Sequence, residues 1–218
     1  MNTYIKKMGV DTSTICFCEV LSLDDWALDM VPRPCRAVVM VYPIKKASEE
    51  FAKQQADEIA ANGQTLSPKL RYIKQTIGNA CGTIGILHAL SNIGVEGLMK
   101  IDSGCYLEKY LESTKDMTGE QIAEYLDSDT ELSATHAEAA SEGSTAVPVD
   151  NTSVDTHFVC FVEIDGNLYE MDGRKAGPIN HGACEPDKLL ETASAIIKGF
   201  MDRDPGEVRF TITALTAP

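Results

Sequence analysis

The segment from Ala80 to Ser91 is apolar on nearly every side, and it constrains the fold more than any other feature of this chain. A helix at the protein surface shows a single apolar stripe, whereas a helix that is apolar all round is buried. We therefore expect a central helix around which the other elements pack. Gly82 and Gly85 lie within it, each costing ~1 kcal/mol relative to alanine. Two such residues in one short helix indicate that something must approach its backbone closely.

Strand and helix signals alternate around this segment along the whole chain, and neither an internal repeat nor a low-complexity linker divides the 218 residues. The simplest interpretation is an α/β (α+β) fold with one domain spanning residues 1–218. The expected helices are Asp24–Met30, Ser48–Asn62, Gly119–Leu126 with a capping box of Thr118 and Gln121, about Asp129 to Ala140, and Glu185–Arg203. The expected strands are Arg36–Tyr42, Phe158–Ile164, Leu168–Asp172 and Glu207–Leu215.

Charge and hydropathy exclude several functions. The formal net charge is −14, with 33 acidic and 19 basic residues, which argues against a nucleic-acid partner because phosphate binding requires a basic surface. The charge would suit a basic partner, although from charge alone simple solubility is the preferred explanation. No stretch approaches the ~20 apolar residues of a membrane helix, and the first nine residues lack the features of a signal peptide. We expect an intracellular protein without a membrane partner.

The seven cysteines do not form a recognisable framework. Their number is odd and they are scattered, which is not typical of a disulfide-bonded protein. Nothing reaches the density of a zinc site with its four ligands, so we expect neither a metal nor another cofactor. Six of the thiols are interpreted as small apolar residues or surface groups.

Cys81 is the exception, because it lies at the start of the apolar helix, with Asn79 as a suitable N-cap. The first turn of a helix stabilises an anion and lowers the pKa of a thiol, and the thiolate is the nucleophilic form. Gln75 precedes it by six residues. Its side chain could donate to a developing oxyanion together with the backbone N–H of Cys81, and one such donor is worth about 10²–10³ in rate. In isolation, a glutamine before a loop is more often polar surface.

A hairpin supplies a base for this thiol. Asp165-Gly166 is a typical two-residue turn, and counting outward from it places His157 opposite Arg174. Asp172 then lies on the same face as His157 at a diagonal distance of roughly 7–8 Å, and its carboxylate can accept a ring N–H and support the imidazolium. A turn of odd length would put the two on opposite faces, leaving an exposed histidine and a turn-forming aspartate.

Three other histidines compete as the base. His88 lies two turns along the helix from Cys81, too far to touch it, and His136 lies in a polar helical stretch. His181 lies in a turn-rich loop and is the strongest competitor. The loop at residues 141–156, which has no periodicity and many turn formers, is either a surface insertion or an active-site loop, and its position beside His157 favours the second.

These residues resemble the motifs of the ubiquitin C-terminal hydrolases. The run Lys74–Gly85 (KQTIGNACGTIG) resembles the nucleophile motif of that family almost letter for letter. His157-Phe158, followed by Leu168–Arg174 (LYEMDGR), resembles its histidine and aspartate motifs with similar spacing. Further matches are Val31–Pro34, Pro178–Gly182 and Phe200–Pro205. The resemblance covers nearly the whole chain and is strongest to the small single-domain members of the isozyme L3 type.

The resemblance implies a thiol hydrolase that cleaves adducts from the C-terminal glycine of ubiquitin. It implies Cys81 as nucleophile, His157 as general base and then acid, and Asp172 as the residue that orients the histidine. Gln75 would help to form the oxyanion hole. The implied fold is papain-like, with a central antiparallel sheet flanked by helices and a knotted backbone, which is rare among proteins.

The resemblance also identifies residues 141–156 as an active-site crossover loop that admits only small adducts or unfolded extensions. It implies Glu19, Glu142 and Asp155 as ubiquitin contacts, and the basic tail of ubiquitin gives the negative charge a partner. A closely related ubiquitin-like modifier is a second candidate partner. Relatives carry an acidic stretch ahead of the helix that begins near Asn2, so we expect weaker ubiquitin binding here or compensation by other acidic residues. A cytoplasmic monomer is expected, with the nucleus as a second location.

Two other classes stay open. Papain-fold acyltransferases and transglutaminases share the order of cysteine, histidine and aspartate, although the run from Gln75 to Gly85 resembles the hydrolases specifically. A ubiquitin-binding module without turnover would predict an incomplete triad, whereas every catalytic position is filled in this chain.

Overall fold

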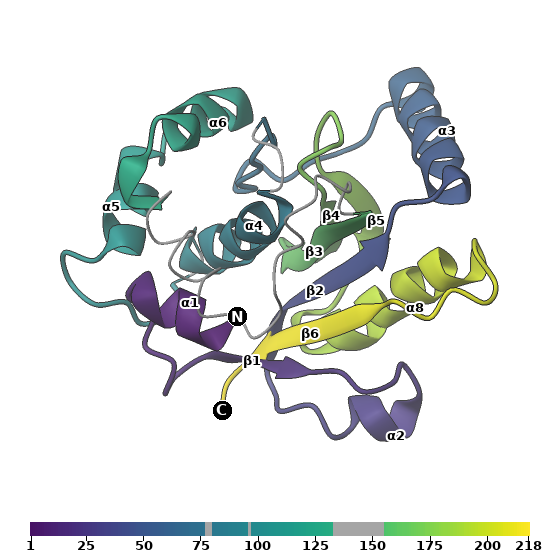
Figure 1. The fold of residues 1–218 in the computed structure, drawn as a ribbon, viewed down its shortest axis with the longest axis horizontal. Coiled ribbons are helices and arrows are strands. Elements are labelled where there is room, and N and C mark those ends of the chain that lie inside the picture. Colours follow the sequence, from purple (N-terminus) through teal and green to yellow (C-terminus); the bar gives the residue numbers. More distant parts are fainter. Residues whose placement is uncertain (77–79, 96, 133–154) are drawn as a thin grey trace.

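A six-stranded antiparallel sheet forms the centre of the computed structural model, which describes residues 1–76, 80–95, 97–132 and 155–218. The strand order is β1-β6-β2-β3-β4-β5, and helices cover both faces (Figure 1). The strands are β1 (Cys16–Glu19), β2 (Cys35–Pro43), β3 (Thr156–Ile164), β4 (Asn167–Met171), β5 (Ile179–Ala183) and β6 (Thr211–Thr216). The expectation of an α+β fold with an antiparallel sheet flanked by helices is confirmed.

The helices form two groups. On one side of the sheet α1, α5 and α6 gather around α4, while α2 and α8 lie on the other side and α3 stands apart (Figure 1). The helices are α1 (Asn2–Lys7), α2 (Asp25–Leu28), α3 (Lys46–Asn62), α4 (Cys81–Val95), α5 (Tyr106–Ser113), α6 (Gly119–Asp127) and α8 (Leu189–Asp202), with a 3₁₀ turn η1 (Pro186–Lys188) before α8.

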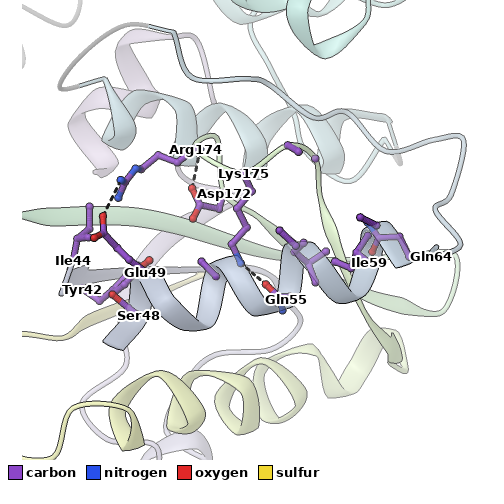
Figure 2. Close-up of a pocket in the computed structure, with 16 residues that line it drawn as sticks. Tyr42, Ile44, Ser48, Glu49, Gln55, Ile59, Gln64, Asp172, Arg174 and Lys175 are labelled. Atoms are coloured by element: carbon purple, nitrogen blue, oxygen red, sulfur yellow. Dashed lines mark hydrogen bonds and ion pairs between the residues drawn. The ribbon is translucent and has the colours of Figure 1, made fainter. Parts of the chain in front are cut away.

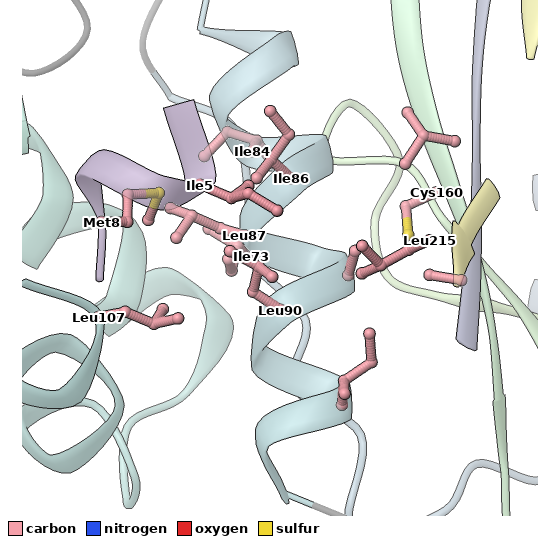
Figure 3. Packing of buried hydrophobic residues seen from close by; sticks show 14 of the residues in the cluster. Ile5, Met8, Ile73, Ile84, Ile86, Leu87, Leu90, Leu107, Cys160 and Leu215 are labelled. Atoms are coloured by element: carbon pink, nitrogen blue, oxygen red, sulfur yellow. The ribbon is translucent and has the colours of Figure 1, made fainter. Parts of the chain in front are cut away.

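Helix α4 is the buried centre of the larger core. Every residue from Thr83 to Ile93 is buried, which confirms the prediction made from its all-round apolar sequence. Figure 3 shows Leu87 and Leu90 between the helices on one side and the sheet, represented by Cys160 and Leu215, on the other. Burial of apolar surface on all sides fixes the position of this helix, and therefore that of its first residue, Cys81.

The buried apolar residues form two cores, one on each face of the sheet, and side chains that alternate along the strands contribute to both. Val39 pairs with Cys160 across β2 and β3, and both face α4, whereas the next pair, Val38 and Phe161, faces α8. This alternation is the normal consequence of the period of two in a strand. Strands β2 and β3 are therefore apolar on both faces and lie in the middle of the sheet.

The hairpin between β3 and β4 has the predicted register. Ile164 pairs with Asn167 across the turn, and both turn residues have positive φ, 52° at Asp165 and 77° at Gly166. Positive φ at both central positions matches the turn to the twist of the strands, which is why aspartate followed by glycine favours it.

Two sequence predictions are wrong in detail. Residues 180–182, predicted as a loop, belong to β5, an edge strand that pairs with β4 through a register shift. Gly182 has φ of 92°, so the turn-like composition reflects an irregular edge strand. The last strand begins at Thr211, four residues later than predicted, and α5 was not predicted.

Other predictions fall partly outside the described residues. Only residues 129–132 of the helix predicted to reach Ala140 are described, and only residues 155 and 156 of the predicted loop at 141–156. The capping box of α6 is present, with Thr118 accepting from the backbone of Gln121. Within the described ranges, no helix is long and apolar enough to cross a membrane.

Candidate active site

Cys81 is half-buried and is the first residue of α4, while its expected cap, Asn79, lies outside the described residues. The glycines that follow it explain how the helix meets the sheet. A Cβ on Gly85 would lie 3.3 Å from Cβ of Phe158, and one on Gly82 would lie 3.4 Å from the ring of Phe158. The close approach predicted from these glycines is therefore to β3, at the residue that follows His157.

His157 and Asp172 form a buried pair. His157 Nε2 lies 2.6 Å from Asp172 Oδ1, and the two residues are only 2% and 3% exposed. The predicted register of the hairpin brings them together, because Asp172 directly follows β4 on the face of His157. The backbone N–H of Arg174 donates to the same carboxylate oxygen at 2.9 Å. Tyr42, opposite His157 on β2, packs its ring edgewise at 6.1 Å between centroids.

The charges of these groups depend on one another. Burial raises the pKa of the Cys81 thiol, but the hydrogen bond to His157 and the charge of its ring outweigh burial, so the pKa lies below its ordinary value. Burial lowers the pKa of His157, whereas hydrogen bonds and charges from Asp172 and Cys81 raise it to about 9. Burial raises the pKa of Asp172, and His157 brings it below the ordinary value. The lowered pKa of Cys81 and the raised pKa of His157 both favour a thiolate beside an imidazolium over the uncharged pair.

Gln75 lies against the turn that follows Asp172. Its backbone N–H donates to the carbonyl oxygen of Gly173 at 2.9 Å. A Cβ on Gly173 would lie 2.9 Å from Cβ of Gln75, so the two segments are in direct contact. The chain thus carries Gln75 into the neighbourhood of the pair, and its role as an oxyanion donor stays a prediction.

The rival histidines have other partners. His88 is fully buried, accepts the backbone N–H of Ile73 at 3.0 Å and stacks on the ring of Tyr72. Burial lowers its pKa to about 4, so it is neutral. His181 lies on β5 and contacts the buried carboxylate of Glu170 at 2.9 Å. His136 lies outside the described residues.

The expected ubiquitin contacts lie at the surface. Glu19 is exposed at the end of β1. Asp155 is exposed and forms an ion pair with Arg209 at 2.8 Å. Glu142 lies outside the described residues. These three assignments stay predictions.

A hollow of about 650 Å³ lies between α3 and the turn after Asp172 (Figure 2). Asp172 and Tyr42 line it on one side and the apolar face of α3 on the other. Two polar contacts cross it, from Arg174 to Glu49 and from Lys175 to Gln55. The hollow therefore separates α3 from the turn that follows Asp172.

The described part of the site shows neither metal ligation nor disulfide bonding. Among the described residues, no group of three His, Cys, Asp or Glu side chains could hold a metal ion. All seven cysteines lie within the described ranges, and none of them forms a disulfide bond. The chemistry available is that of an activated thiol, a histidine and a carboxylate.

Comparison with known proteins decides the family. A sequence profile described as ubiquitin carboxyl-terminal hydrolase, family 1 (peptidase C12), matches residues 1–202. The chain belongs to this family. Because the family is one of cysteine peptidases, the predicted thiol hydrolase is confirmed at this level.

Relatives match along almost the whole chain. Ubiquitin carboxyl-terminal hydrolase 3 of Arabidopsis thaliana is 41% identical over 216 residues, covering 99% of this chain and 89% of its own. Ubiquitin carboxyl-terminal hydrolase isozyme L1 of Rattus norvegicus is 37% identical over 215 residues, covering 99% and 93%. The crystal structure of the Trichinella spiralis UCH37 catalytic domain bound to ubiquitin vinyl methyl ester covers 100% of this chain and 91% of its own, with a TM-score of 0.73. Its identity is 21%, so this likeness concerns the fold alone.

Proposed function

We propose that this member of the family cleaves adducts from the C-terminal glycine of ubiquitin, with Cys81 as the nucleophile. The observation that carries the proposal is the buried contact of His157 with Asp172 at 2.6 Å, together with the hydrogen bond between His157 and the thiol of Cys81. A nucleophile, a base within hydrogen-bond reach and a third group that orients the base are the parts that acyl transfer requires.

The reaction proceeds in two halves. The Cys81 thiolate attacks the carbonyl carbon of the glycine, and the developing oxyanion accepts hydrogen bonds from Gln75 and from the backbone N–H of Cys81. Collapse of this intermediate breaks the bond to the leaving amine, which takes the proton of the His157 imidazolium, and a thioester remains. Water then attacks the thioester while His157 takes its proton, and collapse releases ubiquitin and restores the thiolate.

Asp172 stays ionised throughout this cycle. Its carboxylate fixes the orientation of the ring and stabilises the imidazolium, and it does not itself take the proton. The low pKa of Asp172 and the raised pKa of His157 support this assignment, because both shifts favour the charged pair.

The finer features of the proposal come from the resemblance. They are a single papain-like domain over residues 1–218, a knotted backbone, the L3 subtype, and a crossover loop at about 141–156 that restricts leaving groups to small adducts and unfolded extensions. The formal charge of −14 supports a basic partner such as the tail of ubiquitin. A related ubiquitin-like modifier stays a second candidate substrate, and the cytoplasm, with the nucleus as an alternative, stays the proposed location.

The test is the release of a fluorescent amine from the C-terminus of ubiquitin. We expect release by the wild type and by Cys16→Ala, a control on the half-buried thiol of β1, and none by Cys81→Ala. Full activity in Cys81→Ala would refute the nucleophile. Binding of ubiquitin without release by the wild type would favour a binding module. Transfer of ubiquitin to an added amine, in preference to hydrolysis by water, would favour an acyltransferase.

A further inference from the structure

We propose that Lys74, together with Tyr72, is a positioning residue that holds the Asp172 carboxylate against His157. The inference rests on the proposed function, because it concerns the same site. Asp172 begins a tight turn, residues 172–175, in which the backbone N–H of Lys175 donates to the carbonyl oxygen of Asp172 at 3.0 Å. The N–H of Arg174 donates to the carboxylate. The orientation of the carboxylate therefore depends on where this turn lies.

Side chains from the segment before the nucleophile bind the backbone of this turn. The Lys74 ammonium donates to the carbonyl oxygens of Arg174 at 3.1 Å and Lys175 at 2.6 Å. The Tyr72 hydroxyl lies 2.9 Å from the carbonyl oxygen of Asp172 and 2.6 Å from that of Lys175. A single hydroxyl proton serves these two acceptors, whereas the ammonium can donate to both of its own at once.

Backbone contact completes the attachment. The N–H of Gln75 donates to the carbonyl oxygen of Gly173 at 2.9 Å. All four carbonyl oxygens of the turn thus accept hydrogen bonds from donors within residues 72–75. The segment that carries the predicted oxyanion donor is also the one that holds the turn of the orienting carboxylate. Lys74 therefore couples the two sides of the proposed site.

Contacts on the opposite side of the turn are weaker. There the hollow separates the turn from α3, and the contacts are the 3.5 Å ion pair of Arg174 with Glu49 and the hydrogen bond of Lys175 to Gln55 (Figure 2). Arg174 and Glu49 are largely exposed, and exposed ion pairs contribute little. Helix α3 has no buried residue that could press on the turn. The turn is thus held more firmly by residues 72–75 than by α3. Its remaining side-chain anchor is the ammonium of Lys175, which pairs with the buried carboxylate of Glu170 on β4.

Lys74 contacts carbonyl oxygens and none of the reacting atoms, so we expect it to act through Asp172. In Lys74→Met the side chain keeps a similar length but loses the ammonium group and both hydrogen bonds that it donates. We expect kcat for the ubiquitin amide to fall roughly tenfold, as for loss of a charge-assisted hydrogen bond, with KM little changed. Lys74→Arg, which keeps the donors, should recover most of the activity. Lys69→Met is the matched control, because the ammonium of Lys69 binds Asp165 in a different turn.

A second readout needs no ubiquitin. Alkylation of Cys81 by iodoacetamide, followed by mass spectrometry of its peptide across pH, reports the thiolate in the full chain. Loosening Asp172 weakens the support of the imidazolium, so in Lys74→Met the pKa of Cys81 should rise by roughly half to one unit. Tyr72→Phe should shift it in the same direction.

Two results would overturn the inference. One is an alkylation profile and a kcat in Lys74→Met equal to those of Lys69→Met. The other is a lowered urea midpoint with an unchanged alkylation profile, which would make Lys74 merely structural. Failure of the proposed function is distinguishable, since it would appear as absent amine release in the wild type while the alkylation profiles still differ.

Discussion

Replacing Gly173 by alanine should push the turn of Asp172 away from residues 72–75. The added Cβ would lie 2.9 Å from Cβ of Gln75, 3.0 Å from Cγ2 of Ile84 and 3.2 Å from the backbone nitrogen of Gln75. Nonbonded carbons prefer separations of roughly 3.5–4.0 Å. Two of these atoms belong to the backbone or Cβ of Gln75 and the third lies on the buried helix α4, so a change of rotamer cannot relieve the contacts. The turn must therefore move by several tenths of an ångström.

This movement should affect both stability and activity. Overpacking of this kind costs about 1–3 kcal/mol in the free energy of unfolding. The same movement disturbs the 2.6 Å contact of Asp172 with His157, and misplacement of a catalytic group by about 1 Å costs on the order of 10²-fold in rate. We therefore expect kcat in Gly173→Ala to fall by roughly 10- to 100-fold.

The matched control lies four residues away. A Cβ on Gly177 would meet nothing within 4 Å, and its φ is not in the left-handed region. Gly177→Ala should therefore change the unfolding free energy by no more than about 0.5 kcal/mol and leave kcat unchanged. Urea denaturation and ubiquitin-amide hydrolysis measure the two effects. Equal stability and activity of the two variants would refute the reasoning about the turn.

Two further predictions concern the same site. Because His157 has a pKa of about 9, kcat/KM should fall above about pH 9 as the imidazolium loses the proton that the leaving amine needs. Asp172→Asn removes the charge that raises this pKa, so the basic limb should move to lower pH, and an unmoved limb in the pH–rate profile would contradict the pairing. Alanine is a better helix former than glycine, so Gly199→Ala in α8, where the added Cβ meets nothing, should raise the unfolding free energy by up to about 1 kcal/mol. In Gly85→Ala the added Cβ would lie 3.3 Å from Phe158, and this crowding should cancel the same increase. Equal gains in urea denaturation would show that α4 and β3 are not in tight contact.

Local signals predicted the parts of the site that are set by nearby residues. The Asp165-Gly166 turn determines the register of its hairpin through two positive φ angles, so counting from it places His157 beside Asp172. The all-round apolar sequence of α4 requires burial, which positions Cys81. In both cases the physical cause lies within a few residues of its effect.

Features that depend on distant backbone were not predictable in this way. The role proposed for Lys74 could not be predicted, because its partners are backbone carbonyl oxygens about 100 positions later in the chain. Every residue has a carbonyl group, so the sequence does not show which of them a lysine will bind. Residues 180–182 have a turn-like composition, yet they form part of a strand because β5 pairs with β4. Strand formation at an edge depends on such tertiary pairing more than on intrinsic preference.

The most direct test of the account is to map the covalent adduct that forms with ubiquitin carrying a C-terminal vinyl methyl ester. An activated thiolate adds to the vinyl group, so the reaction identifies the nucleophile without turnover. We predict one ubiquitin per chain, attached to the peptide that contains Cys81, and no adduct in Cys81→Ala. An adduct on any of the other six cysteines, or one that persists in Cys81→Ala, would contradict the assignment of Cys81, His157 and Asp172 as the catalytic site.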